Sequence, residues 1–189
     1  AKATREKILN AVVILINESG YSSASSTAIA KKAGITWGAV QHHFGNKEEI
    51  LVAVMEMARD VYIQSLDQAE INTGTIEERV SHFVDLVWEH YKSDLYFAFS
   101  EIVMATRGTN SNLPLRQIRV NNGLDEHLKR MVDIFEGYDV SQDRLNEVLR
   151  YTHRFLGGFA IDRILEPGMP FEDLHIQRIK DQLLTIIYH

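Results

Sequence analysis

Apolar residues recur at helical spacing along most of the chain, and no stretch shows the sustained alternation that would predict a β-strand. Near the N-terminus Ile8, Leu9, Val12, Val13 and Ile16 fall on one face of a first helix, so we assign them to packing. Capping residues, glycines and prolines divide the rest of the sequence into further helices. Beyond residue 47 the predicted helices span residues 50–71, 75–92, 93–107, 114–135, 141–166 and 172–188.

Residues 25–50 carry the local signals of a helix, a glycine turn, a second short helix and the start of a third. Ser25 is a suitable N-cap, and Gly34 supplies the left-handed conformation that ends the first of these helices. Thr36 then caps a helix predicted over Trp37–His43. This order is that of a helix-turn-helix, whose second helix enters the major groove of DNA.

The second helix of this motif has about two turns, which is too short for a helix to be stable alone. Val40 and Phe44 must therefore pack it against its neighbours. Small residues, an amide and an imidazole remain on its outward side, where they suit close approach to base edges. These outward residues are Trp37, Gly38, Ala39, Gln41 and His42.

The N-terminal quarter of the chain resembles the TetR-type transcriptional regulators. Their pattern appears here as Arg5, Ile8, Leu9, Ala11, Gly20, Tyr21, Ile29, Ala30, Ala33, Gly34, Ile35, Thr36, Gly38, Ala39, Val40, His43, Phe44, Lys47, Glu48, Ile50 and Leu51. The resemblance implies an all-α fold, with a three-helix DNA-binding domain followed by a six-helix ligand-binding and dimerisation domain. We place these domains at residues 1–47 and 48–189. The chain departs from the family at Gln41, where an aromatic residue is usual, and at Ser26, where an apolar one is usual.

Chemistry and the resemblance together assign roles to residues of the predicted DNA-binding domain, residues 1–47, which we call the head. Lys47 opens a helix, so its ammonium and the unpaired helix amides can converge on one phosphate. His43 matches a histidine of the family that contacts the DNA backbone, although it can instead pack inside the domain. Gln41 can pair with adenine, and Trp37 either meets the DNA or plugs the three-helix core. The predicted DNA-binding residues are Thr36, Trp37, Gly38, Ala39, Gln41, His42, His43 and Lys47.

The charge of the chain is unevenly distributed. The formal net charge is −6, yet residues 1–47 hold six basic and two acidic residues, a net charge of +4, which leaves −10 for the remainder. A basic head on an acidic body directs the attraction to phosphate to one end of the chain. If Lys31 and Lys32 are considered alone, the alternative is that they only form a solvated helix face and contact no DNA.

The last two long helices carry more apolar surface than one core face requires. A second apolar stripe implies a second partner, and the resemblance implies a two-fold homodimer built from these helices. The alternative is that both stripes are buried inside one protomer. The predicted dimer-interface residues are Tyr151, Gly158, Ile161, Leu165, Ile176, Ile179, Leu183 and Ile187.

Aromatic residues and methionines gather in the middle of the chain. The resemblance implies an inducer cavity among the middle helices, and such walls suit an apolar or aromatic effector. The alternative is that these aromatic residues only form part of the hydrophobic core and bind no ligand. The predicted ligand-binding residues are Tyr62, Trp88, Tyr91, Phe99, Met104, His127 and Phe155.

Other chemistry finds little support in the sequence. It has no cysteine, no nucleophile motif and no phosphate-binding glycine loop, and its histidines lack metal-ligand spacing, so we expect no enzyme, metal or cofactor. No apolar run approaches membrane-spanning length and no signal peptide is visible, so we expect a soluble cytoplasmic protein. The favoured function is a ligand-responsive, dimeric DNA-binding repressor that a small molecule releases from a palindromic operator. The alternative is a helical small-molecule-binding or enzymatic protein with no DNA-binding role.

Overall fold

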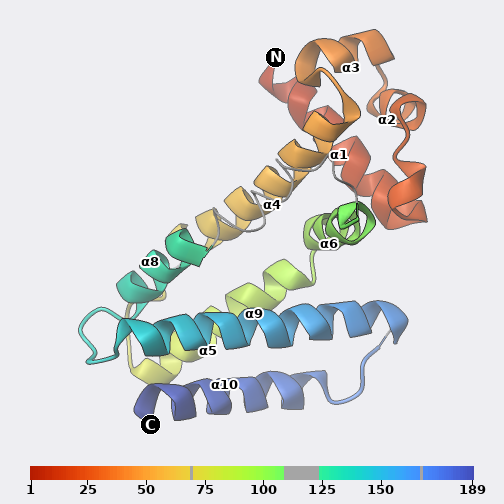
Figure 1. Cartoon of the computed structure of the whole chain (residues 1–189). Helices are drawn as coiled ribbons and strands as arrows, with labels where there is room; N and C mark the ends of the chain where they lie inside the picture. Colours follow the sequence, from red (N-terminus) through yellow and green to blue (C-terminus); the bar gives the residue numbers. More distant parts are fainter. Residues whose placement is uncertain (69, 109–123, 167) are drawn as a thin grey trace. The chain divides into compact units, whose positions relative to one another are not determined.

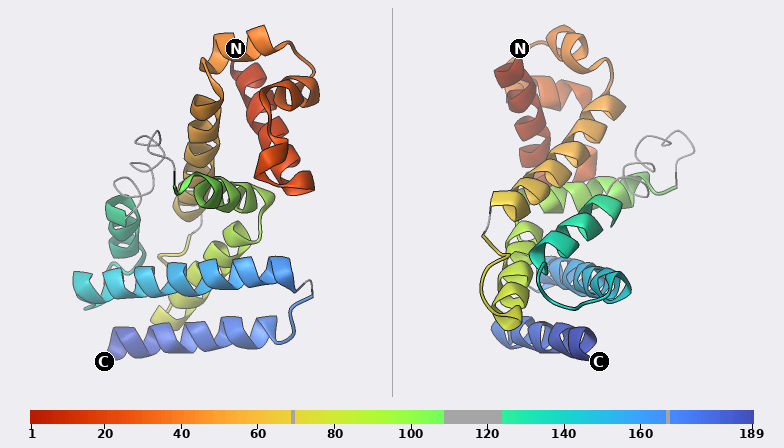
Figure 2. Two further views of the ribbon diagram at one scale, coloured as in Figure 1. Left: turned by 45° about the vertical axis from the view of Figure 1, so that its right-hand side comes forward. Right: turned by 90° about the vertical axis from the view of Figure 1, so that its left-hand side faces the viewer.

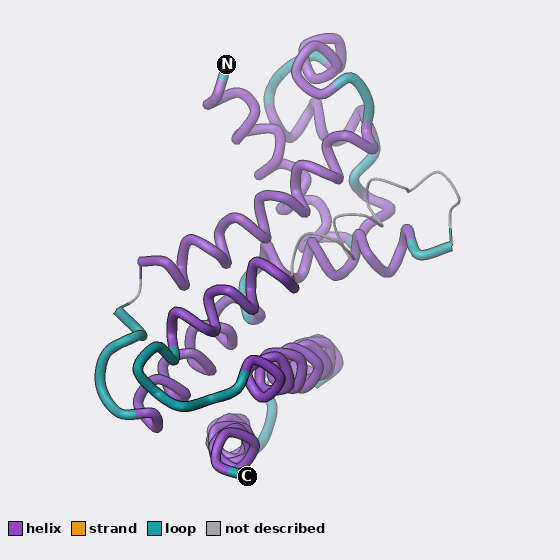
Figure 3. The backbone as a smooth tube through the Cα atoms, turned by 60° about the vertical axis from the view of Figure 1, so that its left-hand side comes forward, coloured by secondary structure: helices purple, strands orange, loops and turns teal. Residues whose placement is uncertain are grey.

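A computed structural model describes residues 1–68, 70–108, 124–166 and 168–189 (Figure 1). Within these ranges the regular structure is helical throughout, joined by loops and turns (Figure 3). The helices are α1 (Lys2–Ser19), the short 3-10 helix η1 (Tyr21–Ser23), α2 (Ser26–Ala33), α3 (Trp37–Phe44), α4 (Lys47–Gln68), α5 (Ile76–Tyr91), α6 (Asp94–Thr106), α8 (Leu124–Ile134), α9 (Gln142–Leu165) and α10 (Glu172–Tyr188).

The helix starts follow the capping residues of the sequence. Ser25, Thr36, Ser93 and Ser141 each accept a backbone N–H of the first turn, at α2, α3, α6 and α9. Thr75 and Glu78 form a capping box at α5. The predicted helix from Pro114 is seen only as α8, because its first part lies outside the described residues, as does most of the loop predicted before it.

The chain divides into two compact units. The first consists of Ala1–Val61 with the segment that begins at Ser93, and the second of Tyr62–Lys92 with the segment that begins at Gly123. The helix α4 runs without interruption from the first unit into the second. The sequence analysis placed the boundary between the DNA-binding and ligand-binding domains at residue 47, and this boundary stays a prediction.

The first unit combines the helix-turn-helix with a helix from much later in the chain. Val12, Ile29 and Val40 are fully buried in its core, and so is Ile102 of α6. Polar contacts tie α6 to α1 and η1: Asn17 Nδ2 donates to the Asp94 carbonyl at 2.9 Å, and Glu101 accepts the Tyr21 N–H at 3.2 Å. The head is therefore built on α6 as well as on its own three helices.

The second unit packs α5 against both α9 and α10, which run side by side in opposite directions (Figure 2). Side chains from all three helices fill the core, among them the fully buried Phe83, Leu149 and Ile179. Ion pairs and hydrogen bonds fasten the edges, such as the 2.7 Å contact between Lys180 and Asp85. Among the described residues, no helix is long and apolar enough to cross a membrane.

We expect Ile102→Ala to destabilise the first unit by about 2–5 kcal/mol, because it leaves a cavity in a core shared by α1 and α6. Ile14→Ala on α1 is the matched control, since that isoleucine is 43% exposed and its truncation should cost under about 1 kcal/mol. Chemical denaturation measures both, and hydrogen exchange locates the loss. Equal effects of the two variants would show that α6 contributes nothing to the head.

Candidate DNA-binding face and buried polar cluster

The turn between α2 and α3 is fixed by a left-handed glycine and two caps. Gly34 has φ 67° and ψ 33°, a conformation that glycine adopts without strain, and its N–H bonds back to α2. Thr36 Oγ1 accepts the Ala39 N–H at 3.2 Å and so begins α3. The predicted end of this helix at His43 is one residue short, because α3 includes Phe44.

Burial of one side holds α3 in place. Val40 is fully buried and Phe44 is 4% exposed, as the two-turn length required. Arg5 of α1 closes the C-terminal end of α3, because its Nη1 donates to the His43 carbonyl and its guanidinium lies 3.9 Å from the Phe44 ring centre. The sequence analysis gave Arg5 no role of its own, although the family pattern includes it.

The opposite side of α3 is open. Thr36, Gly38, Gln41 and His42 are exposed. A Cβ built on Gly38 would come no closer than 3.9 Å to its nearest neighbour, Thr36 Oγ1, so the protomer itself has room for a side chain there. The glycine leaves free space at the start of α3, where a second backbone could approach.

The remaining predicted contacts are less exposed. Ala39 and His43 are half-buried, and Trp37 is partly buried against the core of the first unit. Trp37 was expected to point outward, so its packing against the core corrects that expectation and leaves only part of the ring accessible. A half-buried His43 can either contact the DNA backbone or pack inside the domain, so both alternatives stay open.

Lys47 stands at the first turn of α4 beside the aromatic ring of Tyr21, whose centre lies 5.0 Å from Nζ. Its partial burial lowers the pKa of the Lys47 ammonium from the ordinary value. One amide of this helix end is already taken, since Asn46 Oδ1 accepts the Glu49 N–H at 3.0 Å. One of the amides that the sequence analysis expected to be unpaired at this helix end is therefore occupied within the chain.

Not all of the basic residues of the head are available for phosphate. Lys32 Nζ lies 2.8 Å from both carboxylate oxygens of Glu18. Lys31 is exposed, and so are Lys2 and Lys7 near the N-terminus. The positive character of the head thus rests on fewer free ammonium groups than the sequence count suggests.

A group of aromatic polar side chains lies inside the second unit. Tyr62 comes from α4, His90 and Tyr91 from α5, His127 from α8 and His153 from α9, and we refer to these five residues as the histidine–tyrosine cluster. The ring centre of Tyr62 lies 4.9 Å from those of His90 and His127 and 5.8 Å from that of His153. Four helices therefore meet at this cluster.

Burial controls the protonation of the cluster. It lowers the pKa of His153 to about 3, with smaller contributions from the neighbouring His127 and His90, and it lowers the pKa of His90 to about 4. It also raises the pKa of Tyr62 far above neutrality. His153 Nδ1 forms a 2.7 Å hydrogen bond with the Tyr91 hydroxyl. His90, His153 and Tyr62 are thus uncharged at neutral pH.

The sequence analysis identified only part of this cluster. Tyr62, Tyr91 and His127 were predicted ligand contacts, whereas His90 was considered only for metal binding and His153 was not singled out. The described residues contain no group of three metal-binding side chains that could hold an ion. A signal for His153 does exist, since it continues the apolar stripe of Leu149 and Leu156 at helical spacing.

The other predicted ligand contacts lie elsewhere. Trp88 packs on Phe159 with ring centres 5.1 Å apart and donates to Glu172 at 2.9 Å. Phe155 is 36% exposed on α9. The first unit contains the remaining two, Phe99 partly buried against its core and Met104 46% exposed. The predicted ligand-binding set therefore does not form one site within either unit.

The predicted dimer surface is half wrong. Tyr151, Gly158, Ile161 and Leu165 of α9 are exposed, as an interface requires. The four α10 residues are core instead, because their stripe is the one that packs inside the second unit. They are Ile176, Ile179, Leu183 and Ile187, with exposed fractions of 7%, 1%, 0% and 3%.

The capped turn, the short supported helix and its exposed polar side define a helix-turn-helix. Comparison with known proteins specifies the class further. Residues 8–54 match the family model described as bacterial regulatory proteins, tetR family. These residues contain all of the predicted DNA contacts, so the N-terminal quarter of the chain is similar to the N-terminal region of that family.

Two curated relatives show how far the likeness extends. The chain is 29% identical over 136 residues to the fatty acid metabolism regulator protein of Bacillus subtilis, covering 69% of this chain and 63% of the relative. It is 34% identical over 101 residues to the transcriptional regulator UidR of Escherichia coli, covering 53% and 47%. The matches thus span about half to somewhat under two thirds of the length of these relatives.

Solved structures resemble the chain over nearly its whole length. A transcriptional regulator from Rhodococcus has a TM-score of 0.74 at 20% identity, covering 97% of this chain and 95% of that one. The fatty acid degradation regulator FadR from Bacillus halodurans has a TM-score of 0.70 at 18% identity, covering 95% and 94%. At these identities the likeness establishes the fold alone.

The histidine–tyrosine cluster predicts a stability that falls in acid. Because the folded pKa values of His153 and His90 lie below the unfolded value of about 6.5, the unfolded chain binds more protons as the pH falls from that value. Each of the two histidines should cost about 1–2 kcal/mol of unfolding free energy between pH 7 and pH 5. His153→Gln should reduce this loss in denaturation experiments, and His82→Gln, at an exposed site on α5, should not. Identical pH profiles for wild type and His153→Gln would contradict the burial of an uncharged imidazole.

Proposed function

We propose that the chain is a DNA-binding transcriptional regulator that acts in the cytoplasm, as a repressor released from its operator by a small molecule. The observation that carries this proposal is the open side of α3, a short helix that is capped, buried on one side and polar on the other. The alternative, a helical binding protein or enzyme without a DNA-binding role, has no need of such a surface or of a basic head on an acidic body.

Within this function Gln41 is the residue that reads sequence. Its amide is exposed and can form two hydrogen bonds with adenine in the major groove. Lys47 contacts a phosphate, and Gly38 lets the start of α3 approach the DNA closely. The cap residue Thr36 and His42 complete the surface, with His43, Ala39 and the accessible edge of Trp37 around it.

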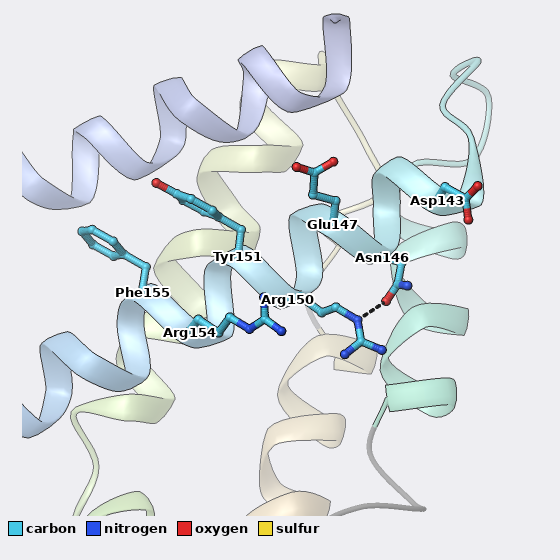
Figure 4. A pocket seen from close by; sticks show the side chains of 7 residues that line it. All are labelled: Asp143, Asn146, Glu147, Arg150, Tyr151, Arg154 and Phe155. Atoms are coloured by element: carbon cyan, nitrogen blue, oxygen red, sulfur yellow. Dashed lines mark hydrogen bonds between the residues drawn. The ribbon is translucent and has the colours of Figure 1, made fainter.

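We further propose a homodimer that places two copies of α3 on a palindromic operator. The exposed side of α9 supports this, because Tyr151, Phe155, Ile161 and Leu165 recur along it at helical spacing. Figure 4 shows Tyr151 and Phe155 beside each other on this helix, and their stacked ring centres are 6.3 Å apart. The exposed Leu174 extends the apolar surface onto α10, in place of the buried residues predicted there.

The effector site belongs to the second unit, at the histidine–tyrosine cluster. An effector must bind the DNA-incompetent state more tightly than the DNA-bound one, because equal affinity would shift no population. The continuous helix α4 carries Lys47 near its start and Tyr62 further along, so a shift at Tyr62 can change the position of the phosphate contact. Linkage then requires DNA to weaken effector binding by the same factor.

DNA binding is tested with a gel shift on the DNA that flanks the coding region. Gln41→Ala should cost about 1–3 kcal/mol on the best sequence and relax the preference at one base pair, since a base contact carries sequence information. Lys47→Ala should weaken binding to all sequences alike and reduce its salt dependence. Uniform losses for Gln41→Ala, or an unchanged salt slope for Lys47→Ala, would refute the corresponding role. No shift with the wild-type protein would remove the proposed function.

The dimer is tested at Gly158, where a built Cβ meets nothing within 4 Å in the protomer. Gly158→Gln should fold normally and gain helix propensity, yet it should shift dimers toward monomers because it fills the space between two α9 helices. Sedimentation at micromolar concentration measures the change, and His82→Gln on α5 is the control. A monomeric wild type, or a variant that stays fully dimeric, would contradict this interface.

A further inference from the structure

The histidine–tyrosine cluster contains buried polar atoms without a hydrogen-bond partner among the described residues, and Tyr62 Oη and His153 Nε2 are among them. Tyr62 is only 3% exposed. A buried polar group without a partner costs about 1–3 kcal/mol, so a ligand group that supplies the bonds to these two atoms would gain that free energy on binding.

The charge state of these groups restricts what can complete them. Tyr62 and His153 are uncharged near neutral pH, and none of the five cluster residues is a carboxylate, lysine or arginine. A charged ligand group placed between Tyr62 and His153 would lose its hydration without gaining an opposite charge from either of them. An uncharged polar group avoids this penalty.

The hydrogen bond between the Tyr91 hydroxyl and His153 Nδ1 links the polarity of the cluster to the tautomer of His153. When the Tyr91 hydroxyl donates to His153 Nδ1 across their 2.7 Å contact, the proton of the neutral imidazole is on Nε2. Tyr62 Oη–H and His153 Nε2–H are then two donors from facing helices, with ring centres 5.8 Å apart. Two donors match one oxygen with two lone pairs, as in a carbonyl group.

We infer that the effector is an uncharged molecule whose carbonyl oxygen, in a ketone, ester, amide or lactone, accepts hydrogen bonds from Tyr62 and His153. The ligand's apolar body lies against the aromatic rings of the cluster, where His127 and His153 stack with centres 5.5 Å apart. This inference rests on the proposed function and specifies the chemical class of its effector.

Three small probes separate the contributions that an aromatic ring, a carbonyl group and a negative charge make to binding. Methyl benzoate is uncharged and has a carbonyl, benzoate has the same ring with a negative charge, and toluene has the ring without an acceptor. Thermal shift and the histidine ring-proton NMR signals measure binding at millimolar concentration, with no DNA present. We expect methyl benzoate to bind more tightly than toluene and to move the His153 signal, and we expect benzoate not to bind.

Tyr62→Phe removes one donor and keeps the ring. It should reduce the preference for methyl benzoate over toluene by about 3–10-fold, the worth of one neutral hydrogen bond. Tyr188→Phe, at an exposed tyrosine on α10, is the matched control and should leave the preference unchanged. The ratio of the two probes cancels any general loss of stability in the variant.

Three results would overturn the inference: benzoate binding as well as the ester, no preference for the ester over toluene, or a preference that Tyr62→Phe leaves intact. Because the probes bind without DNA, these results are independent of the gel shift. A failed gel shift with intact ester preference would remove the proposed regulatory function and leave the carbonyl site standing.

Discussion

The helix-turn-helix depends on the burial of one side of an eight-residue helix. A helix this short does not form alone, so the orientation of every side chain on its open face is set by the packing of Val40 and Phe44. The Thr36 cap fixes its first turn, and Arg5 holds its last. Any role in DNA recognition for Gln41 follows from this support, because an amide can read a base only when its backbone is held still.

The core that supports α3 extends beyond the consecutive helices of the motif. Ile102 and Ala98 of α6 are fully buried in it, so a helix from the middle of the chain shares the head's stability. In the second unit, side chains from four helices meet at a cluster of histidine and tyrosine rings instead of a wholly apolar core. A core that contains unpaired hydrogen-bonding groups is less stable than an apolar one, which is typical of sites that bind a ligand.

The sequence was sufficient for features that depend on neighbouring residues. The caps predicted at Ser25 and Thr36 are present, because a cap is formed by residues within one turn. Helical periodicity also distinguished the buried Val40 and Phe44 from the open side of α3. The helix-turn-helix and its family could therefore be predicted with their residue numbers.

Features that depend on tertiary contacts could not be predicted in this way. Periodicity shows that α10 has apolar stripes but not which stripe meets α5, so Ile179 was assigned to the surface although it is 1% exposed. The aromatic residues of α5 and α6 are close in sequence, yet Tyr91 and Phe99 belong to different compact units. The rings of His153 and Tyr62 come to lie 5.8 Å apart only through tertiary structure, and no local pattern pairs them.

The most direct measurement is backbone amide NMR of the full chain during titration with the DNA that flanks its coding region. If α3 is the recognition helix, the largest shifts should fall on Gly38, Gln41 and His42, with Lys47 next, while α10 changes little. Unchanged α3 amides in the presence of bound DNA, or shifts concentrated in α9 and α10, would contradict the assignment of this face to DNA.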